Sequence, residues 1–136
     1  MSGAFSFRLQ ALLDYKSALE SGCRRDVAEA AKACQGAECR IAALHEELRA
    51  FEDVPDLRLR YLRAEYVEQK LDSEEAIFRD RQAAFQKATA RLRGASQEKR
   101  ALERLKQRHY ALHAAAVARA EEAELEESNA QSAAAR

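Results

Sequence analysis

The sequence predicts an all-α protein in which two long helices form an antiparallel coiled-coil hairpin, with helix 2 longer and overhanging at the C-terminal end. Three observations lead to this prediction. Charged residues make up 34% of the 136-residue chain and hydrophobic residues 47%, largely alanine, with no Trp and four Gly. Such a composition is typical of coiled coils. Apolar residues also recur every three or four positions, and the single proline lies between the two periodic segments.

The first helix is expected from about residue 5 to about residue 51. Its apolar residues follow steps of three and four from Leu19 onward, and only Lys16 interrupts the row before that. This spacing is that of a coiled-coil seam. Two successive steps of four between Leu19 and Val27 form a stutter, which should locally relax the left-handed supercoil.

The turn is expected at residues 52–56, EDVPD, where either Asp53 or Asp56 can cap the next helix. The second helix should run from about residue 57 to about residue 127. Its seam contains Leu71, Phe78, Phe85 and Leu92, each seven residues from the next. Residues 128–136 have no periodic face and are expected to fray. Residues 1–136 are thus interpreted as one hairpin.

A short turn makes the two helices antiparallel, so opposite positions should have numbers that add to about 108. This pairing places Ala30 opposite Phe78 and Cys23 opposite Phe85, with small residues facing large ones. Phe5 then falls opposite about residue 103. Residues 105–127 should extend beyond helix 1. Their apolar stripe needs another partner, because an isolated helix of this length is only marginally stable in water.

Charge is segregated along the second helix, although 23 basic residues balance 23 acidic ones overall. Residues 99–113, KRALERLKQRHYALH, carry five Lys or Arg and one Glu, whereas residues 114–127 carry one Arg and five Glu. Leucines at seam spacing and a single aromatic residue, Tyr110, argue against nucleic-acid binding. We interpret the basic run as a protein-binding surface, with a solvated coiled-coil flank as the alternative.

The chain has no glycine-rich phosphate loop, nucleophile elbow or zinc-ligand spacing. We therefore expect no enzymatic activity, no cofactor, no metal and no small-molecule substrate. His109 and His113 are interpreted as polar or interface residues rather than metal ligands. The three cysteines fit reduced thiols, and no secretory or membrane-spanning segment is evident, so the protein is expected to be cytoplasmic.

The segment DLRLRYLRAEY, residues 56–66, carries more large apolar side chains than one seam can cover. Either Leu59 and Leu62 or Tyr61 and Tyr66 must point away from the seam. Exposed aromatic residues beside arginines are enriched at protein contact surfaces. The alternative is that these side chains wrap the turn itself.

Three segments together resemble the FliJ family of the bacterial flagellar type III export apparatus. The opening FSFRLQALLDYKSALE is similar to the family phrase F-x-F-x-L-Q-x-L-L-x-Y-R, with Lys16 in place of the usual Arg. LRLRYLRAEY is the central segment. Residues 98–131 contain a match to K-x-L-E-K-L-K-E-R at Arg100–Arg108, and they approximate E-x-x-E-L-D-E, with Glu126 in place of Asp.

The resemblance implies a non-enzymatic protein that resembles the central stalk of rotary ATPases. It would bind a hexameric export ATPase (FliI-like), promote its assembly and activity, and link it to the export gate cytoplasmic domain (FlhA-like) and to export chaperones. Its location would be the cytoplasmic face of the inner membrane at the flagellar base, peripherally associated. Alternatives are the stalk protein of a virulence injectisome, a structural coiled-coil homo-oligomer and a nucleic-acid-binding hairpin.

By position, the resemblance also implies two sets of contact residues. The residues expected to face the ATPase are Arg8, Lys16, Arg100, Arg104, Lys106, Arg108 and Tyr110. Those expected to face the export gate are Leu44, Phe51, Tyr61 and Tyr66.

Overall fold

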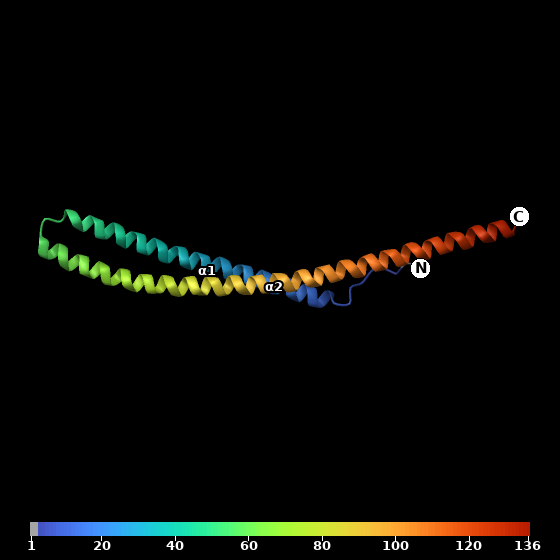
Figure 1. Ribbon diagram of the computed structural model, residues 1–136, viewed down its shortest axis with the longest axis horizontal. Coiled ribbons are helices and arrows are strands. Elements are labelled where there is room, and N and C mark those ends of the chain that lie inside the picture. The colour runs from blue at the N-terminus through green and yellow to red at the C-terminus, as the bar shows by residue number, and fades with distance from the viewer. Residues whose placement is uncertain (1–2) are drawn as a thin grey trace. The chain divides into compact units, whose positions relative to one another are not determined.

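The computed structural model, which describes residues 3–136, contains two long helices joined by a short turn (Figure 1). Helix α1 spans Gln10–Ala50 (41 residues), a 3-10 turn η1 spans Phe51–Asp53, and α2 spans Leu57–Ala134 (78 residues). The helices run antiparallel, and residues 3–136 contain no strand. The predicted all-α fold class is thereby confirmed, including the greater length of the second helix.

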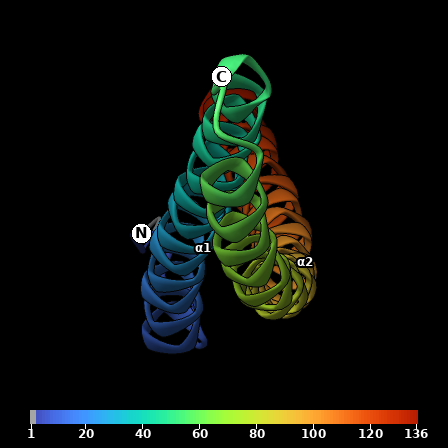
Figure 2. The ribbon, with the colours of Figure 1, turned by 90° about the vertical axis from the view of Figure 1, so that its left-hand side faces the viewer.

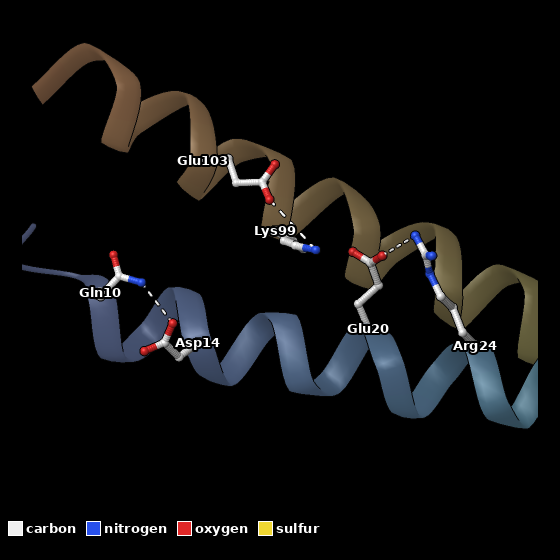
Figure 3. A network of polar contacts seen from close by, with 6 residues as sticks. All are labelled: Gln10, Asp14, Glu20, Arg24, Lys99 and Glu103. Atoms are coloured by element: carbon white, nitrogen blue, oxygen red, sulfur yellow. Dashed lines mark hydrogen bonds and ion pairs between the residues drawn. The ribbon is translucent and has the colours of Figure 1, made fainter. Parts of the chain in front are cut away.

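The predicted start of the first helix is wrong by about five residues. The first helical backbone bond runs from the Leu13 N–H to the Leu9 carbonyl, 2.9 Å, and the Gln10 N–H donates to the Phe7 carbonyl in a preceding turn, 3.0 Å. The Gln10 side chain also donates to the Asp14 carboxylate, 2.9 Å, within the first turn (Figure 3). The residues before Gln10 are not helical because Phe5 and Phe7 both pack against α2, as described below.

The predicted frayed tail is also corrected, because α2 continues to Ala134. The Ala135 N–H still donates to the Gln131 carbonyl at 3.0 Å. The physical reason is local: the segment SNAQSAAAR is rich in alanine, the residue with the highest helix propensity, and contains no Gly or Pro to interrupt the helix.

Contacts group the chain into two compact units. Unit 1 consists of the chain up to Ala18 together with Ser96–Arg136, and unit 2 consists of Leu19–Ala95. Each unit therefore contains a part of α1 and a part of α2, and each is described by itself.

The core of unit 2 lies near the turn, between its two helices. Leu44, Val67 and Leu71 form a buried cluster, and Val67 is 1% exposed. Ile41, Leu48 and Phe51 pack against the cluster as partly buried neighbours. Figure 2, in which the turn faces the viewer, shows the two helices side by side. Because full burial of such a side chain is worth roughly 1.5–3 kcal/mol, this cluster is the main attachment between the helices here.

Asp56 caps the N-terminus of α2, which decides between the two candidate aspartates. Its carboxylate accepts hydrogen bonds from the N–H groups of Arg58 (3.1 Å) and Leu59 (3.4 Å). The Arg60 guanidinium donates to the Glu52 carbonyl at 2.9 Å and ties α2 to the turn. The cap satisfies donors that no helical carbonyl can reach, which is worth about 0.5–2 kcal/mol.

The register of the hairpin differs from the predicted one. Arg40 pairs with Glu74 at 3.0 Å, and the Arg63 guanidinium lies 5.8 Å from the centre of the Phe51 ring. The residue numbers in both pairs add to 114 rather than 108. The turn explains why the sum is larger. The 3-10 turn η1 follows the end of α1 before the chain reverses, so α2 begins farther along the chain than Phe51. Pairs inferred from 108, such as Ala30 with Phe78, are therefore wrong.

We expect Leu71→Ala to lower the free energy of unfolding by about 2–3 kcal/mol, because it removes apolar contacts from the buried cluster. Urea unfolding followed by circular dichroism measures the change. Leu62→Ala is the matched control on the same helix, since Leu62 is 55% exposed, and should cost less than about 0.5 kcal/mol. Equal losses in the two variants would show that the seam does not hold unit 2 together.

Candidate partner-binding surfaces

A non-helical N-terminal strap, residues 3–9, packs along α2 within unit 1. The Phe5 ring centre lies 5.3 Å from that of Tyr110, edge to face, and 5.6 Å from that of His113. Phe7 is 7% exposed and lies 5.6 Å from the His109 ring. Both histidines therefore serve as packing partners for phenylalanines. Aromatic pairs in such geometries contribute about 0.5–1.5 kcal/mol beyond their area burial.

The strap covers part of the α2 stripe that was expected to be bare from residue 105. Gly3 lines a shallow depression together with residues of α2 between His113 and Glu124. Beyond Val117, however, every residue of α2 is exposed. The expected overhang is thus shorter than predicted, because an extended segment spans about twice the length per residue of a helix.

Three arginines form an exposed row on α2, which we call the arginine stripe: Arg100, Arg104 and Arg108. They lie on successive turns of the helix, four residues apart. None of the three has an ion-pair partner among residues 3–136. Glu103, the acid within this segment, pairs instead with Lys99 at 3.8 Å (Figure 3). Within the part of the chain that the structure describes, the stripe is therefore a positively charged surface whose arginines form no ion pair.

The arginine stripe points away from the strap. At 100° per residue, the three arginines fall on the side of α2 opposite His109 and His113, which contact the strap. The burial pattern agrees, since Leu102 and Leu105 are half-buried while the arginines are exposed. A partner can reach the stripe while the strap stays in place.

The other predicted ATPase-facing residues have different surroundings within unit 1. Arg8 is exposed on the strap. Lys106 and Tyr110 line a shallow depression beside Phe5, and Tyr110 remains 57% exposed. Lys16 is engaged, because its ammonium pairs with Glu98 of α2 at 2.6 Å. Lys16 therefore belongs to the contact between α1 and α2 and not to the surface that was predicted to face the ATPase.

The four residues predicted to face the export gate lie in unit 2, and they differ in how far they are buried. Leu44 is 9% exposed in the core cluster, so its expected role at a surface is corrected. Phe51 is half-buried beneath Arg63. Tyr61 and Tyr66 are exposed and available to a partner.

A second apolar row, which we call the tip stripe, lies on α2 near the turn and consists of Leu59, Leu62 and Tyr66. These side chains are 42%, 55% and 58% exposed. Their spacing places them on one side of α2, away from Val67 and Leu71 of the buried seam. The Lys70 ammonium lies 5.1 Å from the centre of the Tyr66 ring. The tip stripe is therefore an exposed apolar surface with a cation, Lys70, beside it.

Comparison with known protein families, with curated proteins and with solved structures found no match to this chain. The class of molecule is therefore given by its own structure: a helical hairpin protein with an arginine stripe in one unit and a tip stripe in the other. Neither α1 nor α2, as far as residues 3–136 describe them, offers a stretch long and apolar enough to span a membrane. The three cysteines are free thiols.

The pairing of Lys16 with Glu98 gives a prediction about pH. The hydrogen bond to the Glu98 carboxylate raises the pKa of Lys16 above its ordinary value. A raised pKa in the folded state means that the pair stabilises unit 1 at neutral pH and loses this effect as alkaline pH deprotonates Lys16. We expect Glu98→Gln to lower the Lys16 pKa toward that of an exposed lysine, measured by NMR titration. Lys87, which is exposed, is the internal control; an unchanged Lys16 pKa would contradict the pairing.

Proposed function

We propose that this chain is a non-enzymatic component of a flagellar type III protein export apparatus. It acts as a central-stalk-like coiled coil that binds the hexameric export ATPase, promotes its assembly and activity, and links it to the export gate and to export chaperones. The observation that carries this proposal is the arginine stripe. Its residues lie in the segment that resembles the FliJ phrase K-x-L-E-K-L-K-E-R, and they have no partner within the described chain.

The chemistry of the stripe supports contact with a ring. A helix inside a ring of six similar subunits must contact each of them in turn, and a single tight contact would fix it to one subunit. Exposed guanidiniums on successive turns make weak, long-range and salt-sensitive contacts with acidic side chains. Such contacts favour association without requiring one fixed orientation.

The tip stripe supports a second contact at the other unit. Tyr is enriched among residues that dominate binding energy, and Tyr66 of the tip stripe is exposed beside Lys70. Tyr61 is exposed on another side of α2. We assign the tip stripe to the export gate in the proposal. The two contacts use different units, so variants can separate them.

The first test measures the ATPase rate of the cognate export ATPase as the purified chain is added. We expect the wild-type chain to raise the rate. The double variant Arg104→Glu and Arg108→Glu should need a roughly tenfold higher concentration for the same effect, because attractive contacts become repulsive. Raising the salt concentration should weaken stimulation by the wild-type chain.

The matched control for this test is Arg79→Glu with Arg81→Glu, two exposed arginines of unit 2 with the same change in charge. It should stimulate like the wild type. An ATPase rate and hexamer population that do not respond to the wild-type chain would overturn the proposal. Equal loss in both double variants would show that net charge, and not the stripe, is responsible.

The second test measures binding to the cytoplasmic domain of the export gate by calorimetry. We expect Tyr66→Ala to weaken binding about tenfold or more, because it removes the largest side chain of the tip stripe. Tyr15→Ala is the matched control, since Tyr15 of unit 1 is similarly exposed, 61% against 58%. Stimulation of the ATPase should not change in Tyr66→Ala. Unaltered gate binding would remove the tip stripe from the proposal.

A further inference from the structure

The arginine stripe is one end of a longer exposed face of α2 within unit 1. This face, which we call the palindromic face, consists of Arg100, Arg104, Arg108, Ala111, Ala115, Ala118, Glu122 and Glu126, all of them exposed. It begins with three cations, continues through three alanines and ends with two anions. No ion pair within residues 3–136 involves any of its charged members.

Helical geometry keeps these residues on one side of α2. Successive members are three or four residues apart, the spacing of neighbours along a helix surface. Arg104 and Glu122 are 18 residues apart, which is five turns at 3.6 residues per turn, or about 27 Å. The face therefore runs straight along the helix over this distance. It lies opposite the contacts of the strap with His109 and His113. At its edge the Arg119 guanidinium donates to the Ala115 carbonyl at 3.4 Å.

The order of charges along the face is complementary to itself. Consider a second copy of α2 that runs antiparallel, related to the first by a two-fold axis at the level of residue 113. The numbers of opposite residues then add to 226. Arg100 then faces Glu126 of the other copy, and Arg104 faces Glu122. By symmetry each pair occurs twice, as in any isologous interface. A parallel copy in register would instead place each arginine against the same arginine.

We propose that the occupant of this face is a second copy of this chain, bound antiparallel through the palindromic face. The central pairs are Ala111 with Ala115 and Arg108 with Ala118. Small side chains at the contact allow helix axes to approach to about 8 Å, the lower end of the usual range. At that separation the flanking arginines and glutamates reach one another across the interface.

The dimer is a weak and salt-sensitive one. Exposed ion pairs each contribute little, and alanines bury little apolar surface, so the association depends on four weak pairs acting together. Raising the salt concentration from about 0.1 M to 1 M shortens the Debye length from about 10 Å to 3 Å and should dissociate the dimer. This association does not depend on the proposed ATPase partner. If that proposal is correct, the dimer and the ATPase compete for the arginine stripe.

Sedimentation equilibrium of the purified full chain at low salt, with single and mixed variants, tests the proposal. Arg104→Glu alone places glutamates opposite each other twice, and Glu122→Arg alone does the same with arginines. Each variant should raise the dissociation constant about tenfold or more. An equimolar mixture of the two should recover wild-type affinity, because both contacts in the mixed dimer are again attractive. Recovery is the result expected for this register, in which position 104 of one copy faces position 122 of the other.

The matched controls are Arg79→Glu and Glu75→Arg, exposed residues of unit 2 with the same changes in charge. Each should self-associate like the wild type, and circular dichroism should show unchanged helix content in all variants. A wild-type chain that stays monomeric up to about 1 mM, a very weak affinity, would overturn the proposal. Recovery failing in the mixture would overturn it as well, because it would exclude this register.

The ATPase assay separates this proposal from the proposed function. Glu122→Arg reverses a residue outside the predicted ATPase-facing set and should still stimulate the ATPase, whereas Arg104→Glu should stimulate less. Loss of self-association in Glu122→Arg with stimulation retained supports both proposals. A wild-type chain that dimerises without stimulating the ATPase supports the dimer alone.

Discussion

The seam of α2 is longer than the helix available to cover it, and the rest of the structure follows from this mismatch. α2 has 78 residues and α1 has 41. An apolar stripe left in water destabilises a helix, because helices in proteins are held mainly by packing of that stripe. The strap reduces the mismatch: Phe5 and Phe7 lie outside the helix and pack against His109, Tyr110 and His113 of α2. Beyond Val117 every residue of α2 is exposed.

The charged residues divide into those that hold the hairpin and those left for other molecules. Lys16 with Glu98 in unit 1, and Arg40 with Glu74 in unit 2, connect α1 to α2 and agree on one register. Among residues 3–136, the arginine stripe makes no such connection. A cation without an internal counter-charge contributes little to the stability of the fold, so its chemistry is available for binding. Both proposals for unit 1 use this same free charge, and therefore they describe competing states of one surface.

The prediction of the candidate site was correct where it depended on exposed charge. It was wrong where it depended on how deeply a side chain is buried. The basic run in residues 99–113 indicated the arginine stripe, because exposed charges can be read from their spacing. The resemblance to the FliJ family placed Leu44 at a surface by position, although its spacing also fits the seam, and the structure buries it there. The strap was missed, although the alternation of Phe5, Ser6 and Phe7 is the two-residue period of an extended segment. Three residues are too few for that period to outweigh the helical pattern that follows.

The sequence by itself determined the all-α class, the two helices and the turn before Leu57. These features depend on local spacing, helix propensity and an aspartate beside the only proline, all of which act over a few residues. The tertiary structure alone decided the register, the strap and the identity of the paired charges. The register depends on the path of η1 past the end of α1, and the pairing of Lys16 depends on a residue 82 positions away. Interactions between distant residues carry no local pattern, so they appear only when the chain is folded.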